Sequence, residues 1–96
     1  MNINLDSEGF LVDRDDWSED IARELASRDG VEISEQIMTY ITTARAMYEK
    51  EGTVPPIRKF SKAMGVTSKD LYDVFHKGPM KIICKWGGLP KPTGCV

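Results

Sequence analysis

The sequence is poor in cysteine and histidine. Its 96 residues include only two cysteines, Cys84 and Cys95, and one histidine, His76. A closed structural zinc site takes four ligands, mostly cysteine and histidine, at short and characteristic spacings. Two cysteines separated by ten residues, with a single histidine, do not supply such a set. We therefore expect no metal site.

Long apolar segments are also missing. The first sixteen residues have no basic start followed by an apolar run, as a secretory signal would. The longest uncharged run in the helical region, residues 36–44, is about half of what a bilayer span requires. We expect a cytoplasmic protein without direct membrane insertion, in which a cysteine pair is redox-active or transient instead of a permanent staple.

The net charge of −2 conceals a strong asymmetry. Residues 1–54 carry thirteen acidic and five basic side chains, a balance of −8, whereas residues 55–96 carry two acidic and eight basic ones, a balance of +6. A basic half suggests an anionic partner or substrate, although an internal dipole would give the same pattern. The candidate docking residues are Arg58, Lys62, Lys77, Lys81 and Lys85.

The apolar pattern predicts a mainly helical domain that begins with a hairpin. Two short apolar pieces, 3–5 and 10–12, flank a loop that contains Gly9, which is typical of a hairpin. Apolar residues at helical spacing then predict about five helices, with the first capped by Asp16 and the last ended by Gly87 and Gly88. The expected helices cover 16–30, 34–52, 55–64, 67–75 and 79–86.

The third and fourth helices have the spacing of a helix-turn-helix, with Gly65 at the turn. The second of them would read the bases, but it carries Asp70 and Asp73, which repel the DNA backbone. It also lacks an arginine or asparagine that could read a base edge. We therefore expect a helix pair used for packing, and the DNA-binding regulator remains an alternative.

The chain ends in an arm, residues 87–96, that follows a globular domain of residues 1–86. Gly87, Gly88 and Gly94 are the candidate hinge positions of this arm, because glycine tolerates chain reversals. Cys84 lies on or beside the apolar side of the last helix, and Cys95 lies at the tip of the arm. A short tether keeps two such thiols at an effective concentration on the order of millimolar. The spacing suits an attacking thiol, Cys95, and a resolving thiol, Cys84, with Lys77, Lys81 and Lys85 nearby.

The ending KGPMKIICKWGGLPKPTGCV, together with EGFLVDRDDW near the start, resembles the DsrC family, the γ subunits of dissimilatory sulfite reductase. The chain is also similar to the TusE branch, which relays sulfur for tRNA thiolation. That branch typically keeps the terminal cysteine and lacks the upstream one, so Cys84 favours the DsrC side.

The resemblance implies an α+β fold, a short N-terminal β meander packed on a helical array with a flexible C-terminal arm. It implies a sulfur-carrying co-substrate of the sulfite reductase α and β subunits, with sulfurtransferase-like activity at most. Cys95 would accept a partly reduced sulfur atom, which ends in a trisulfide with Cys84. A membrane-bound reductase complex would then release sulfide, and in sulfur oxidisers the flow would reverse. Siroheme and iron–sulfur clusters would belong to the partner.

Overall fold

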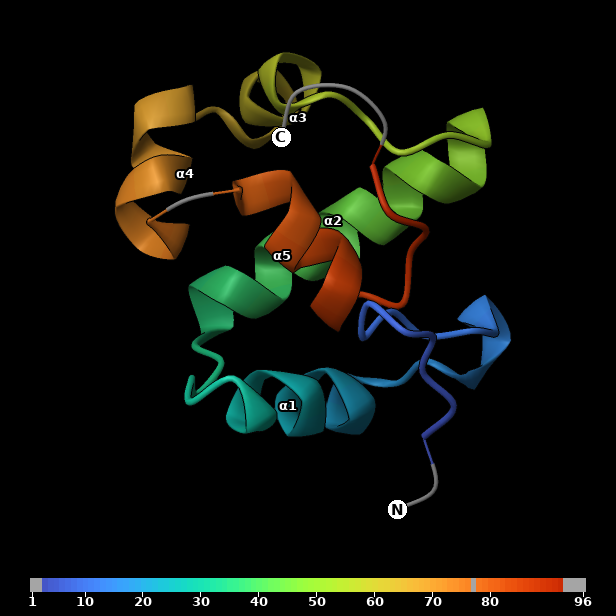
Figure 1. Ribbon diagram of the computed structural model, residues 1–96. Coiled ribbons are helices and arrows are strands. Elements are labelled where there is room, and N and C mark those ends of the chain that lie inside the picture. The colour runs from blue at the N-terminus through green and yellow to red at the C-terminus, as the bar shows by residue number, and fades with distance from the viewer. Residues whose placement is uncertain (1–2, 77, 93–96) are drawn as a thin grey trace.

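The computed structural model describes residues 3–76 and 78–92, and all its regular elements are helical (Figure 1). A single 3-10 turn, η1, precedes five α-helices. The elements are η1 (Arg14–Asp16), α1 (Glu19–Arg28), α2 (Glu35–Glu51), α3 (Ile57–Met64), α4 (Ser68–Phe75) and α5 (Pro79–Trp86). Within the described residues no helix is both long and apolar enough to cross a bilayer.

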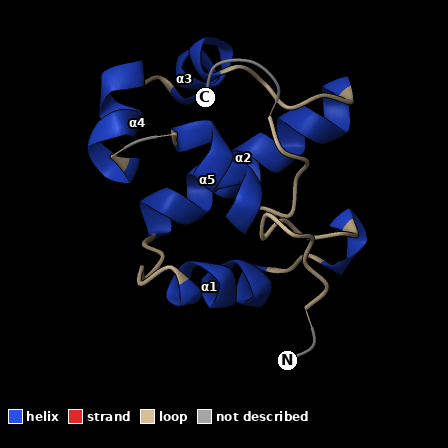
Figure 2. Cartoon of the chain, viewed as in Figure 1, coloured by secondary structure: helices blue, strands red, loops and turns tan. Residues whose placement is uncertain are grey.

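The expected α+β fold with an N-terminal β meander is wrong, since Figure 2 shows helices and loops without a strand among the described residues. The hairpin path exists, but it is reduced to one antiparallel bridge between Leu5 and Leu11. The Asp6 carboxylate accepts hydrogen bonds from the backbone N–H groups of Glu8 and Phe10, at 2.8 and 3.0 Å. This side chain tightens the turn, and the bridge ends before a ladder can form.

No third strand follows, because the chain turns directly into η1. The Asp13 side chain accepts a hydrogen bond from the N–H of Asp15 at 2.9 Å and caps this turn. The sequence suggested Asp16 as the cap of the first helix. This expectation is wrong, because Asp16 lies inside η1. Ser18 takes that position, and its hydroxyl accepts from the N–H of Ile21 at 3.2 Å.

The other helices begin and end close to where the sequence places them. Ser34 caps α2, and Gly52 ends it in the left-handed conformation. Thr67 and Asp70 form a capping box at α4, in which each side chain accepts from the other residue's N–H. Pro79 stands in the first turn of α5, where its missing N–H costs nothing.

Helix α5 lies at the centre of the molecule and packs against α1, α2 and α4 (Figure 1). Five of its eight residues are apolar and buried, whereas Lys81 and Lys85 are not buried. Aromatic side chains from three helices meet beside it, with Tyr40 about 6 Å from both Phe60 and Phe75. The cysteine of this helix is therefore buried in the core of the fold.

Candidate functional site

Cys84 lies in the last turn of α5 and has no exposed surface. It carries a free thiol, and burial raises the pKa of that thiol to about 12. The thiolate is the reactive form of cysteine, so Cys84 in this arrangement is a poor nucleophile at neutral pH. The expectation that Cys84 lies on the apolar side of the last helix is confirmed.

The last turn of α5 ends in a Schellman motif that contains Cys84. The N–H of Leu89 donates to the carbonyl oxygen of Cys84 at 3.0 Å, and Gly88 is left-handed with φ of +67°. A methyl group at Gly88 would lie 2.9 Å from two atoms of Trp17 and 3.1 Å from Leu11. Only glycine fits this turn without displacing neighbours.

Two side chains hold the start of the arm against the helices. The indole N–H of Trp17 donates to the carbonyl oxygen of Trp86 at 2.8 Å. The Arg45 guanidinium stacks over the Trp17 ring, 4.1 Å from its centroid, and donates to the carbonyl oxygen of Gly87 at 2.6 Å. Burial, and next the positive charge of Arg14, lower the pKa of Arg45, so this cation is held at an electrostatic cost.

The described part of the arm, residues 87–92, follows the body of the protein. Residues 87–89 are buried, and Lys91 pairs with Glu8 at 3.0 Å. In Figure 1 the red segment after α5 turns back towards the end of α2. Pro90 and Lys91 line a hollow with Tyr48 and the connection to α3. Movement about Gly87 and Gly88 stays a prediction, while Gly94 and Cys95 lie outside the described residues.

Asp29 joins the end of α1 to the end of α5. Its carboxylate accepts from the Trp86 indole N–H at 3.0 Å and from the Lys85 ammonium at 3.0 and 3.2 Å. Burial by itself raises the pKa of this carboxyl, but the bonds from Trp86 and Lys85 outweigh it and hold the pKa below its usual value. Trp86 is therefore held at two points, its indole N–H by Asp29 and its carbonyl oxygen by Trp17.

Three of the five candidate docking residues are exposed. Arg58 and Lys62 lie on exposed positions of α3, and Lys81 is exposed in the first half of α5. Lys85 is committed to Asp29, and Lys77 lies outside the described residues. Arg58 and Lys62 therefore lie on a different helix from Cys84, and we call the exposed Arg58, Lys62 and Lys81 the basic surface.

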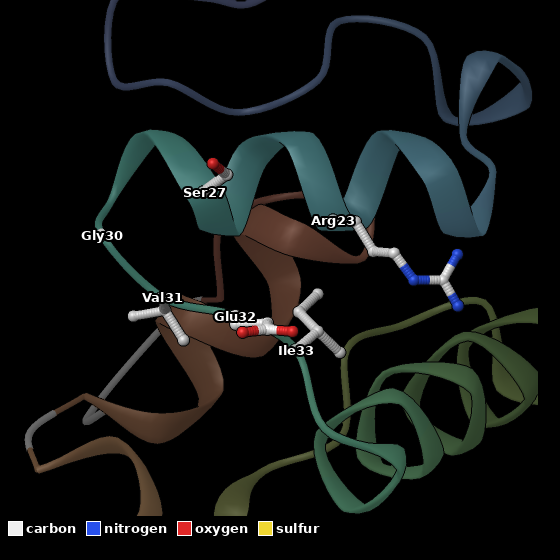
Figure 3. A pocket seen from close by; sticks show the side chains of 6 residues that line it. All are labelled: Arg23, Ser27, Gly30, Val31, Glu32 and Ile33. Carbon is white, nitrogen blue, oxygen red and sulfur yellow. The ribbon is translucent and has the colours of Figure 1, made fainter.

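Two hollows of the surface are lined in part by charged side chains that already form ion pairs with other residues. One of about 560 Å³ lies between α1 and the loop that follows it (Figure 3). Its Arg23 is already paired with Glu19 and Asp20. Another, of about 470 Å³, contains Asp29 and Lys85, which are paired with each other. Among the described residues no three His, Cys, Asp or Glu side chains are arranged to hold a metal ion.

Sequence reasoning missed Trp17 and Arg45. Trp17 falls within the expected first helix, 16–30, whereas in the structure it precedes α1. Arg45 interrupts the otherwise uncharged middle of α2, beside the buried Ala44, and this was the available signal. A cation between core positions requires a partner, but the sequence does not say that the partner is the carbonyl of Gly87.

Comparisons with known proteins agree over the whole chain. The family model described as "DsrC like protein" matches residues 1–96. The γ subunit of dissimilatory-type sulfite reductase from Nitratidesulfovibrio vulgaris is 38% identical over 96 residues, covering 99% of this chain and 91% of that protein. The sulfurtransferase TusE of Yersinia pseudotuberculosis is 38% identical over 101 residues, covering 98% and 94%. A chain in a crystal structure of dissimilatory sulfite reductase I is 34% identical, with a TM-score of 0.84 over 98% of this chain and 91% of that one.

Proposed function

The chain belongs to the DsrC family, and on this premise we propose that it is a sulfur carrier that acts with a dissimilatory sulfite reductase. Cys95 accepts a sulfur atom that the reductase has partly reduced, and Cys84 closes the product as a trisulfide. Sulfite, the two thiols, an electron pair from the reductase and four protons combine to give the trisulfide and three water molecules. The chain contributes thiols only, and siroheme and iron–sulfur clusters are the partner's.

The position of Cys84 is the observation that carries this proposal. The thiol lies in the last turn of the central helix, and the arm that ends with Cys95 leaves directly from that turn. Burial keeps Cys84 protonated, so it does not compete for the incoming sulfur. The terminal thiol loads first, and the helical thiol acts after it. A membrane-bound reductase of trisulfides would return both thiols.

Mass spectrometry tests the proposal. The protein is incubated with a dissimilatory sulfite reductase, sulfite and an electron donor, and its intact mass is measured without added thiols. Relative to the dithiol protein, we expect a gain of one sulfur atom and a loss of two hydrogens, located by digestion in a peptide pair that contains Cys84 and Cys95. Samples without sulfite serve as the control. An unchanged mass with an active reductase would contradict the proposal.

A relay of sulfur towards tRNA is the second candidate, favoured by the 38% identity with TusE. The two candidates differ in their need for the second thiol. A relay passes a persulfide from one protein to the next and requires only the terminal cysteine, whereas a trisulfide requires both. A Cys84→Ala protein that still transfers sulfur at full rate would therefore support the relay.

The basic surface is proposed to dock the carrier on its anionic partner. Lys81→Glu should slow association with the reductase about two- to tenfold at low salt, with an effect that fades as salt rises. Lys69→Glu, an equal charge change on α4, is the matched control because Lys69 is not among the docking residues. Stopped-flow mixing measures the rates. Equal slowing by both variants, or by neither, would show that Lys81 has no special role.

A further inference from the structure

Trp17 and Arg45 come from different parts of the chain and converge on two adjacent carbonyl oxygens. Trp17 precedes α1, Arg45 lies in the middle of α2, and the carbonyls belong to Trp86 and Gly87. These carbonyls stand at the end of α5, where the helix leaves backbone acceptors without internal partners. Both bonds therefore hold the exact piece of chain that joins Cys84 to the arm.

We propose that Trp17 and Arg45 act as positioning residues, forming a latch that keeps residues 87–89 on the body and Cys84 closed to reagents until the segment lifts. We call this set of two side chains and two carbonyls the arm latch. Cys84 has no exposed surface, so any reagent or persulfide must wait for an opening. Lifting residues 87–89 breaks the bond from the N–H of Leu89 to the carbonyl of Cys84 and removes the buried Leu89 side chain.

The closed arm latch carries an electrostatic penalty on Arg45 that opposes its hydrogen bonds. The guanidinium of Arg45 is partly buried, and burial and the like charge of Arg14 disfavour its charged form, an effect that Glu49 and Asp15 offset only in part. It contacts the ring of Trp17 and the carbonyl oxygen of Gly87. Opening returns this cation to water, which offsets part of the lost hydrogen bonding. Leu89 and the glycine turn oppose the opening, because lifting them exposes apolar surface. Such a balance suits a segment that opens locally while the helices stay folded.

Thiol alkylation measures the opening directly. In a Cys95→Ala background Cys84 is the only thiol, and its reaction with iodoacetamide is followed by intact mass. Trp17→Phe keeps an aromatic ring but removes the N–H donor, and it should speed alkylation roughly fivefold, the value of one neutral hydrogen bond. Arg45→Met removes a charged donor and should speed it roughly tenfold or more. Arg23→Met, on the exposed side of α1, should leave the rate unchanged.

Two further readouts separate the latch from general loosening. Alkylation of the latch variants should depend weakly on low urea, because local opening exposes little surface, whereas global unfolding depends on it steeply. Hydrogen exchange at the Leu89 amide should accelerate by the same factor as alkylation, while the amide of Ala44 in α2 keeps its rate.

The proposal is overturned if both variants alkylate at the parent rate, or if the acceleration follows the urea dependence of global unfolding. Two variants on different elements keep the test decisive should one of them fold poorly. The inference rests on the proposed function for the role of Cys84 as the second thiol. Alkylation needs neither sulfite nor a partner, so a failed latch and a failed sulfur loading are distinguished.

Discussion

Replacing Cys95 by alanine is expected to abolish sulfur loading, while replacing Cys84 should allow loading and stop the next step. The buried Cys84 thiol, with its pKa of about 12, is almost entirely protonated at neutral pH and has no exposed surface from which to attack first. In Cys84→Ala the sulfur on Cys95 has no internal thiol to close on. A persulfide or an intermolecular disulfide should then accumulate.

Mass spectrometry after incubation with the reductase and sulfite measures both variants, with the parent protein as reference. Cys95→Ala should show no added sulfur, and Cys84→Ala should show added sulfur on a peptide that contains Cys95 alone. Cys84→Ser is a second check, because serine keeps a γ atom at this buried position and removes the thiol. Loading of Cys95→Ala together with failure of Cys84→Ala would mean that the thiols have the opposite roles.

Gly88→Ala is expected to lower the free energy of unfolding by about 2–5 kcal/mol. A left-handed residue with a side chain costs about 1–2 kcal/mol, and forcing a methyl group into a packed contact adds about 1–3 kcal/mol. At Gly88 both costs apply, since φ is +67° and the methyl would lie 2.9 Å from Trp17. Urea denaturation followed by circular dichroism gives the difference from the parent.

Gly52→Ala is the matched control for this experiment. Gly52 is left-handed as well, with φ of +74°, but nothing lies within 4 Å of a methyl group there. It should therefore lose only the conformational part, about 1–2 kcal/mol. Equal losses in the two variants would show that Trp17 moves aside freely, and the contact between Trp17 and the arm would then carry little energy.

The helices were predictable because their signals are local. A cap, an apolar stripe and a stop lie within one segment, as with Ser34 and Gly52 around α2, or Pro79 and Gly87 around α5. The strands were not predictable in this way, because a ladder depends on pairing as well as on composition. Asp6 and Asp13 bind nearby backbone N–H groups instead, and these short-range bonds replace the expected sheet.

The candidate site was predictable in one half only. The helical location and burial of Cys84 follow from the apolar positions of α5, and the spacing of the two cysteines suggested its role as a resolving thiol. The expectation that the transferred atom is sulfur came from the resemblance of the chain's end to a family. The arrangement around it depends on contacts between residues far apart in the sequence. Arg45 and Gly87 are separated by 42 positions, and Trp17 and Trp86 by 69 positions. Such pairs leave no periodic trace in one sequence.

The attachment of residues 87–91 to the body gives Cys95 two possible reaches. With the chain held as far as Lys91, which pairs with Glu8, four steps remain to Cys95, and a fully extended chain spans at most roughly 13–14 Å over that distance. If the chain is released back to Trp86, nine steps remain, and the limit becomes roughly 30–32 Å. A catalytic centre near a partner's surface is accessible to both forms. A centre at the bottom of a deep channel is accessible only to a carrier whose attachment has opened, so depth alone would select which partners can exchange sulfur with it.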